Sequence, residues 1–278
     1  MRKIKGGKMR VGDFELIIDQ THNLPYILDA YPDYGANLIR LARKISTKYK
    51  NLKIFDVGAN IGDTIAMLLS DNPDYMIIGI EGDDHYFKLL SKNVGEHPNV
   101  ILHKKFLGDT HGISYKETKR MGGTLRLKNG DTSNKKTTEF TTLDEFITGH
   151  PDYKSVKLLK IDTDGYDNQI IRGGEAYLAE AKPVIYFEYD KTFLSANGEN
   201  GMDIFAFLKK HDYTDVIFFD NYGRFLLSTT INDEKLMRQL DRYIDERNGA
   251  FAYYDIVVFH RSDSDIARSF IADEERRI

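Results

Sequence analysis

The feature that most constrains this chain is a glycine-containing turn between two short apolar runs. The first run ends with Asp56 and Gly58, Gly62 follows, and a helical pattern of apolar residues begins at once. The second run, residues 76–80, ends in Glu81. Two apolar runs separated by one helical segment are typical of a strand–helix–strand unit with parallel strands. We therefore predict an α/β fold with a ligand-binding loop after the first of these strands.

The glycine spacing indicates which ligand this loop accepts. Gly58 and Gly62 allow a tight turn and a close approach of the backbone to a ligand, and Glu81 lies where a ribose diol would bind. The spacing is not the Gly-x-Gly-x-x-Gly of dinucleotide sites, and no lysine follows Gly62 as in a P-loop. Because both phosphate-binding signatures are missing, a nucleoside without phosphates fits better, and S-adenosylmethionine is the common one.

Hydrophobic periodicity divides the chain into an N-terminal segment and one large domain. Residues 1–50 predict a basic tail, a short strand or hairpin within 9–20 and a leading helix over 34–49. Residues 51–278 predict a Rossmann-like, doubly wound, seven-stranded and mostly parallel sheet with helices on both faces and an insertion at 108–155. A helix before the last strand leaves the direction of that strand open. The expected strands are Leu52–Val57, Met76–Glu81, Val100–Leu107, Val156–Asp162, Val184–Glu188, Val216–Phe219 and Ile256–Phe259.

The composition excludes several classes of function. A net charge of -4 gives no bulk attraction to nucleic acid or to an anionic membrane, so we expect no nucleic-acid partner. The chain has no cysteine, which excludes disulfides, thiolate zinc sites and cysteine nucleophiles and is compatible with the cytoplasm. No segment approaches the roughly twenty apolar residues of a membrane span.

Carboxylates end five of the expected strands, at Asp56, Glu81, Asp109, Asp162 and Glu188. In open α/β sheets, ligands bind beyond the carboxyl ends of the strands. An acidic rim attracts a sulfonium cation, whereas a phosphate needs helix N-termini, lysine or arginine. We expect Glu81 to accept both ribose hydroxyls, Asp109 to accept from the adenine amino group, and Asp56 to brace the loop through backbone N–H groups. The expected cofactor contacts are Asp56, Gly58, Asn60, Gly62, Glu81, Gly82, Asp83, Gly108 and Asp109.

Four separated motifs together resemble the FkbM family of S-adenosylmethionine-dependent methyltransferases. They are Asp-Val-Gly-Ala-Asn-Ile-Gly at 56–62, Thr-Leu-Asp-Glu-Phe at 142–146, Leu-Lys-Ile-Asp-Thr-Asp-Gly-Tyr-Asp at 159–167 and the segment 183–188. The resemblance covers roughly residues 52–190. It implies a class I methyltransferase fold and usually O-methylation, often of sugar or polyketide hydroxyls. The family commonly has Glu-Pro at the end of the second strand, where this chain has Glu81-Gly82.

Methyl transfer to an alcohol requires a group that accepts the hydroxyl proton as the new bond forms. Asp162 and Glu188, at the ends of adjacent strands, are our candidates for the base and for substrate orientation. For Asp164 and Asp167, the expected role is instead to brace the loop or to cap the next helix. A competing interpretation makes Asp162, Asp164 and Glu188 ligands of a divalent metal such as Mg²⁺, since these are hard oxygen ligands. Among the histidines, His85 and His111 are further candidates for a base, with surface or capping positions as the alternative.

The resulting hypothesis is an enzyme that methylates a hydroxyl of a sugar, glycan or related metabolite, so its partner is a small-molecule or glycan acceptor. Transfer to nitrogen or to a carboxyl group, and an inactive module that only binds S-adenosylmethionine, are the alternatives. Residues 121–124, Met-Gly-Gly-Thr, predict either a lid over the acceptor or a hairpin turn. The acceptor's identity and the oligomeric state stay open.

Overall fold

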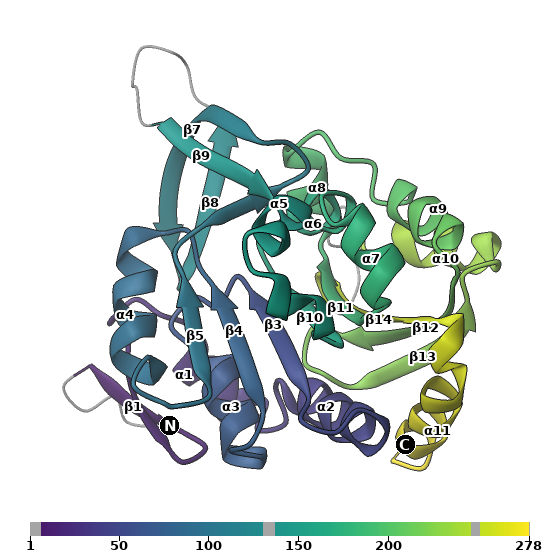
Figure 1. The fold of residues 1–278 in the computed structure, drawn as a ribbon, viewed down its shortest axis with the longest axis horizontal. Helices are drawn as coiled ribbons and strands as arrows, with labels where there is room; N and C mark the ends of the chain where they lie inside the picture. The colour runs from purple at the N-terminus through teal and green to yellow at the C-terminus, as the bar shows by residue number, and fades with distance from the viewer. Residues whose placement is uncertain (1–6, 130–136, 246–250, 278) are drawn as a thin grey trace.

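A computed structural model of the chain describes residues 7–129, 137–245 and 251–277. Its centre is an eight-stranded sheet in the order β13-β12-β14-β11-β10-β3-β4-β5 (Figure 1). The five strands from β5 to β11 are parallel, β14 runs antiparallel to both of its neighbours, and β13 is antiparallel to β12. The strands are β3 Lys53–Val57, β4 Met76–Ile80, β5 Val100–His103, β10 Leu158–Ile161, β11 Val184–Tyr189, β12 Tyr213–Asp220, β13 Phe225–Thr230 and β14 Tyr254–His260.

Helices cover both faces of this sheet and form two hydrophobic layers with it. One layer contains α1 Leu24–Ala30, α2 Ala36–Lys48, α3 Asp63–Asp71, α4 Asp84–Val94 and α11 Ser264–Glu275. The other contains α5 Leu143–Thr148, α6 Asp167–Arg172, α7 Glu175–Ala181, α8 Lys191–Ala196, α9 Asp203–Lys210 and α10 Glu234–Tyr243. Short 3-10 turns lie at Pro151–Ser155 and Arg261–Asp263. No helix of the described ranges is long and apolar enough to cross a membrane.

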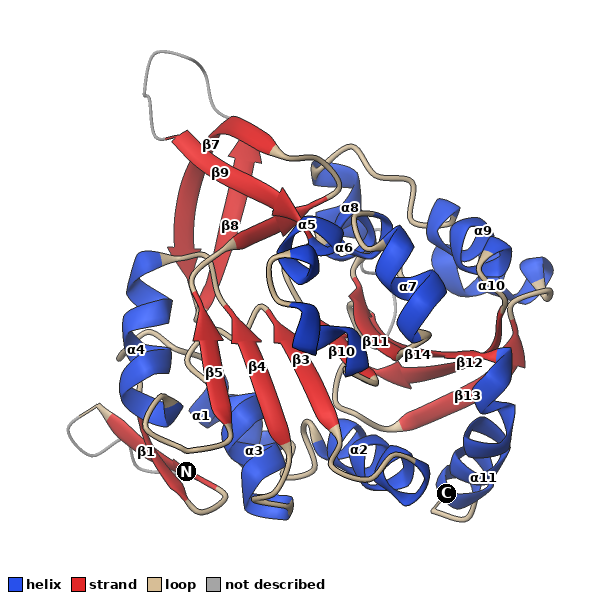
Figure 2. Cartoon of the chain, in the orientation of Figure 1, coloured by secondary structure: helices blue, strands red, loops and turns tan. Residues whose placement is uncertain are grey.

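Two smaller sheets accompany the central one. The hairpin of β1 Lys8–Val11 and β2 Phe14–Ile17 places apolar side chains in the same layer as α2 and α3. The insertion forms a four-stranded sheet in the order β6-β9-β7-β8. Figure 2 shows this sheet rising beyond the ends of β4 and β5, on the side where the parallel strands finish. Its strands are β6 Phe106–Gly108, β7 Gly112–Met121, β8 Thr124–Asn129 and β9 Thr137–Thr142.

The sequence prediction of a doubly wound, mostly parallel sheet is confirmed, and the expected leading hairpin and helix are present. The count of seven strands is wrong, because β13 forms an additional, partly exposed edge strand after a tight turn at Gly223. The third strand also ends earlier than expected, at His103. Two lysines interrupt the apolar pattern there, and Phe106–Gly108 pairs with β9 in the second sheet instead.

The helices also differ from the prediction in places. The expected helix from Tyr166 to Glu180 is divided into α6 and α7 at Gly173-Gly174. A Cβ at residue 173 would lie 2.1 Å from the carbonyl oxygen of Gly108, so this break is where the insertion packs against the domain. The predicted cap of α5 is confirmed, since Thr142 and Glu145 form a reciprocal capping box. Helices α1, α8 and α11 were not expected from the periodicity.

A buried ion pair lies in the middle of the parallel strands. Asp56 on β3 and Lys160 on β10 are register partners, both are fully or nearly fully buried, and the Lys160 Nζ lies 2.9 Å from the Asp56 carboxylate. Burial alone would lower the pKa of Lys160, but the charges of Asp56 and Asp162 together raise it above its ordinary value. No hydrogen bond reaches Asp56 from the backbone of the described loop 58–62, so the prediction that Asp56 braces this loop is corrected. It is the counter-ion of Lys160.

We expect the Lys160→Met variant to lose about 3–5 kcal/mol of unfolding free energy, because it leaves the Asp56 carboxylate buried without its counter-charge. The double variant Asp56→Leu/Lys160→Met should recover most of this loss, since it removes both charges. Urea unfolding measures both values. The matched control is Lys154→Met, whose ion pair with Glu180 is exposed at 3.0 Å and should be worth less than about 1 kcal/mol. A similar small loss for Lys160→Met would contradict this account of the pair.

Candidate functional site

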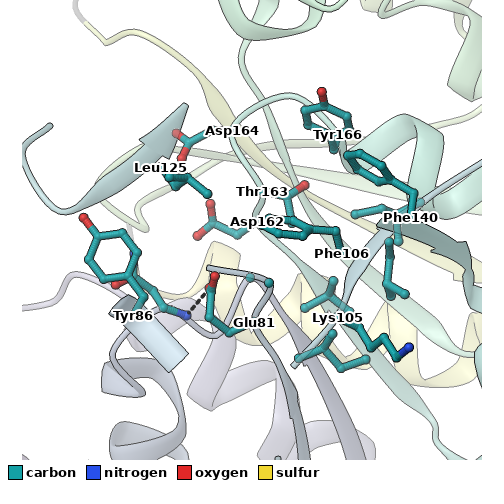
Figure 3. Close-up of a pocket in the computed structure, with 17 residues that line it drawn as sticks. Glu81, Tyr86, Lys105, Phe106, Leu125, Phe140, Asp162, Thr163, Asp164 and Tyr166 are labelled. Carbon is teal, nitrogen blue, oxygen red and sulfur yellow. Dashed lines mark hydrogen bonds between the residues drawn. The ribbon is translucent and has the colours of Figure 1, made fainter. Parts of the chain in front are cut away.

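A cavity opens at the carboxyl ends of β3, β4 and β10, and we call it the first cavity (Figure 3). Three groups of residues enclose it: the loops after these strands, the segment that leads into β6, and the second sheet with α6. Figure 3 shows Tyr86 and Leu125 on one side and Phe106, Phe140 and Tyr166 on the other, with Glu81 and Asp162 between them. The lining consists of Val57, Gly58, Asn60, Ile80, Glu81, Gly82, Tyr86, Lys105, Phe106, Leu107, Leu125, Phe140, Asp162, Thr163, Asp164, Tyr166 and Ile170.

The loop after β3 has the tight geometry that its glycines predict. Gly58 has φ +77°, and a Cβ there would lie 1.9 Å from the carbonyl oxygen of Asp162, so a larger residue cannot occupy this position. Asn60 adopts the left-handed conformation with φ 48°, which is uncommon outside glycine. This turn directs the backbone N–H of Asn60 toward the end of β4, where it donates to Glu81.

Glu81 is the most constrained acid of the first cavity. Its two carboxylate oxygens accept one backbone N–H each, from Asn60 at 3.0 Å and from Asp83 at 2.7 Å. The side chain is buried, and this burial raises its pKa to about 7 despite the two hydrogen bonds. Each oxygen keeps a further lone pair, so the carboxylate can still accept hydrogen bonds from a pair of neighbouring hydroxyls.

An aromatic wall faces Glu81 across the first cavity. Phe140 and Tyr166 are stacked with ring centroids 5.6 Å apart, and Phe106 lies 5.8 Å from Phe140. Gly82 allows this packing, because a Cβ on it would lie 2.3 Å from the Phe106 ring. Sequence reasoning missed this wall, since Phe106 and Phe140 come together only through the pairing of β6 with β9, which are distant in the sequence. The Phe106-Leu107 pair follows two lysines and reads in the sequence as the end of the third strand, so it does not indicate the wall.

Asp162 and Asp164 lie on the loop after β10 and both line the first cavity. The side chain of Asp162 is 44% exposed, and Asp164 adopts the left-handed conformation with φ 52°. Asp167 supports this loop from below. Its carboxylate is buried and accepts from the Thr163 hydroxyl at 2.9 Å and from two backbone N–H groups, which agrees with the bracing role considered for it. Burial raises the pKa of Asp167 to about 6.

Glu188, the second candidate for catalysis, does not line the first cavity. It is buried at the end of β11, opposite Asp255 of β14 in the strand register. Burial, and next the charge of Asp162, raise its pKa well above the ordinary range of a glutamate. One carboxylate oxygen has no hydrogen-bond partner among the described residues.

Five of the predicted cofactor contacts lie outside the first cavity: Asp56, the buried partner of Lys160 described above, and Gly62, Asp83, Gly108 and Asp109. Asp83 caps helix α4 by accepting from the N–H groups of residues 85 and 86, and its carboxylate pairs with Arg120 at 2.6 Å. Gly62 precedes α3, where a Cβ would lie 2.9 Å from a Leu90 methyl carbon. Gly108 and Asp109 belong to the second sheet and its following turn, and Asp109 is paired with Arg172 at 3.2 Å. We therefore do not carry these five into the proposed cofactor contacts.

The Met-Gly-Gly-Thr segment is a hairpin turn that joins β7 to β8. The side-chain amide of Asn60 donates to the carbonyl of Gly123 at 2.6 Å, and the backbone N–H of Asn23 donates to Gly122 at 3.0 Å. Together with the Arg120–Asp83 pair, these contacts fasten the hairpin beside the first cavity, where Leu125 forms part of the lining.

Neither a metal centre nor a histidine base is supported. Within the described ranges, no three acidic or histidine side chains are arranged to hold a metal ion, so Asp162, Asp164 and Glu188 do not form such a set. His85 pairs with Asp19 at 2.6 Å and His111 pairs with Glu145 at 3.0 Å. Neither histidine lines the first cavity. Both side chains are partly exposed, as in the alternative prediction that these histidines occupy surface or capping positions.

Comparison with solved structures gives similarity to several methyltransferases. The FkbM methyltransferase from Methylobacillus flagellatus KT matches at 14% identity and a TM-score of 0.40, over 60% of this chain and 39% of that chain. The chain thus spans well under half of that protein. Precorrin-6y C5,15-methyltransferase from Geobacter metallireducens GS-15 matches at 15% identity and a TM-score of 0.41, over 81% and 86%. The plantazolicin methyltransferase BpumL, solved with S-adenosylhomocysteine, matches at 11% identity and a TM-score of 0.39, over 85% and 90%.

Comparison with curated proteins gave no match. A family description, "Methyltransferase FkbM domain", matches residues 56–214, which is more than half of the chain and contains the loop after β3, Glu81 and Asp162. The central sheet has the parallel order around β3 and the antiparallel β14 described above. The chain therefore has the class I methyltransferase fold and belongs to the FkbM methyltransferase family.

Proposed function

We propose that this protein transfers a methyl group from S-adenosylmethionine to a hydroxyl of a sugar, glycan or related metabolite. The observation that carries the proposal is the pairing of Glu81 with an aromatic wall across the first cavity. Glu81 is fixed by two backbone N–H groups and can accept a ribose diol. The flat, apolar surface of Phe106, Phe140 and Tyr166 suits an adenine ring.

The remaining lining fits the charge of this cofactor. Asp162 and Asp164 lie at the side of the first cavity that faces β10, where a sulfonium cation would be attracted to them. Gly58 and Asn60 of the loop after β3 are also part of the lining. When bound, the cofactor supplies an electrophilic methyl group, so the protein's own task is to place an acceptor oxygen, exclude water and receive a proton.

Asp162 is the group we assign to proton acceptance. It is the partly exposed carboxylate at the border of the first cavity, and it lies 3.6 Å from the Nζ of the buried Lys160. We assign Glu188 to orienting the acceptor, because β11 lies beside β10 and one carboxylate oxygen of Glu188 has no hydrogen-bond partner among the described residues.

The first test is calorimetry with S-adenosylmethionine, S-adenosylhomocysteine and NAD. We expect micromolar binding of the first two and no comparable binding of NAD, because the first cavity lacks both phosphate-binding signatures. A strong preference for NAD would contradict the proposed cofactor. Binding of S-adenosylmethionine without turnover of any acceptor would contradict the enzymatic part and favour an inactive binding module.

We expect the affinity for S-adenosylhomocysteine to increase as the pH rises through about 7, the pKa of Glu81. The deprotonated carboxylate accepts both ribose hydroxyls, whereas a protonated one has lost an acceptor. Glu81→Gln should remove this pH dependence and weaken binding by about tenfold or more, as expected for lost charge-assisted hydrogen bonds. Calorimetry between about pH 6 and 8 measures both effects around this pKa. The control Glu96→Gln changes an exposed acid and should retain the wild-type profile.

We expect Asp162→Asn to retain S-adenosylhomocysteine binding while kcat falls by about a hundredfold or more, the usual contribution of a positioned base. Turnover is measured as release of S-adenosylhomocysteine with a panel of sugars. Glu188→Ala removes the hydrogen-bonding group and should mainly raise the KM of the acceptor, whereas Glu188→Gln keeps a donor and an acceptor and should raise it less. An unchanged kcat in Asp162→Asn would refute its assignment as the base.

A further inference from the structure

A second cavity lies against the other side of Asp162. It is formed between the start of α2, the helix α3 and the ends of β10, β11 and β14. Asp162 belongs to the lining of both cavities, whereas Glu81 and the aromatic wall belong to the first cavity alone. A molecule in the second cavity and a molecule in the first cavity would therefore both lie beside Asp162, the side chain that we assign as the base.

Hydroxyl-bearing and acidic side chains dominate the polar part of this second lining. Tyr34 comes from the segment before α2, Tyr186 from β11, and Tyr253 and Asp255 from the start of β14. The Asn37 amide donates to the Tyr186 hydroxyl at 3.0 Å and reaches the Asp255 carboxylate at 3.5 Å. These contacts fix two of the polar groups in place before any ligand arrives.

The described lining of the second cavity offers no uncommitted cation to an anionic occupant. Asp162 and Asp255 are part of its lining, and Glu188 lies beside Asp255 in the strand register. Lys160 is the basic residue of the described lining, and its charge is committed to Asp56 at 2.9 Å. A phosphate or carboxylate would meet these acids without a cation to receive it, while neutral hydroxyl groups find several acceptors and phenolic partners.

Several polar residues that line this cavity lie outside the part of the chain that matches the family. That match covers residues 56–214, which includes Asp162 and Tyr186. Tyr34 precedes it, and Tyr253 and Asp255 follow it. The shared part of the domain thus provides the border with the first cavity, and the flanking segments of this chain provide the opposite wall.

We propose that the second cavity is the acceptor site and that it selects an uncharged, hydroxyl-rich acceptor over phosphorylated or carboxylated ones. This inference rests on the proposed function. In the reaction, the acceptor oxygen forms a bond to the methyl carbon as the carbon–sulfur bond breaks. The electron pair of that bond returns to sulfur, which becomes a neutral thioether, and the hydroxyl proton passes to Asp162.

The absence of cysteine from the chain allows a direct test, because a single introduced thiol can be labelled selectively. The Met67→Cys variant places the thiol in the second cavity, and the Leu125→Cys variant places one in the first. The probes are S-adenosylhomocysteine, methyl glycosides of common hexoses, and the corresponding hexose 6-phosphates and uronic acids. The measured quantity is the rate of labelling by a small maleimide.

We expect S-adenosylhomocysteine to slow labelling of the Leu125→Cys variant at least tenfold. With that ligand present, at least one neutral glycoside should slow labelling of the Met67→Cys variant at least fivefold, and its phosphate and uronate should not. Adding Asp255→Asn should raise the half-protecting concentration of the glycoside about tenfold. Native unfolding temperatures check that each variant is folded.

The outcomes separate the two proposals. If S-adenosylhomocysteine does not protect the Leu125→Cys variant, the proposed function fails at its cofactor site. If that ligand protects but only anionic sugars protect the Met67→Cys variant, or no sugar does, the acceptor proposal is overturned and the cofactor site stands. Methylation of a glycoside that leaves the Met67→Cys thiol unprotected would also overturn it.

Discussion

The ion pair between Lys160 and Asp56 is the interaction on which the rest of the site depends. It links the neighbouring parallel strands β3 and β10, on which the two residues are register partners. It also places the Lys160 ammonium group 3.6 Å from the Asp162 carboxylate, in the loop after β10. A buried lysine is costly unless its charge is matched, so the strand that carries it is constrained to lie beside β3. The same alignment positions Gly58 under the carbonyl of residue 162, where no side chain would fit. Stability and site geometry thus share one set of contacts.

The two cavities differ in what their polar groups can do. The first combines one buried, doubly hydrogen-bonded acid with an aromatic wall, which suits a nucleoside. The second combines phenols with acids, which suits hydroxyl groups. Their common residue, Asp162, has the exposure that a proton acceptor needs, while Glu81 and Glu188 are held at raised pKa by burial. Burying these acids lowers stability as the pH rises from the ordinary pKa of a glutamate through the raised one, because over that interval the native state binds more protons than the unfolded chain.

The sequence allowed prediction of the parts of the site that are encoded locally. The loop at Gly58, the acid at Glu81 and the loop acid at Asp162 each follow a short apolar strand, and the structure gathers all three around one cavity. The aromatic wall and the second cavity could not be predicted, because they depend on pairing between distant segments. Asp109 illustrates the limit: an apolar pair after two lysines reads as the continuation of one strand, whereas the chain leaves the central sheet there. The role of Lys160 in a buried strand could likewise not be predicted, because its partner Asp56 is set by the register of β3 with β10.

The most direct test of the central claim is a crystal structure of the protein with S-adenosylhomocysteine. The account predicts the ribose hydroxyls on the Glu81 carboxylate, the adenine against Phe106 and Phe140, and the sulfur facing Asp162. A ligand bound away from the first cavity, or one placed there with its ribose remote from Glu81, would contradict it.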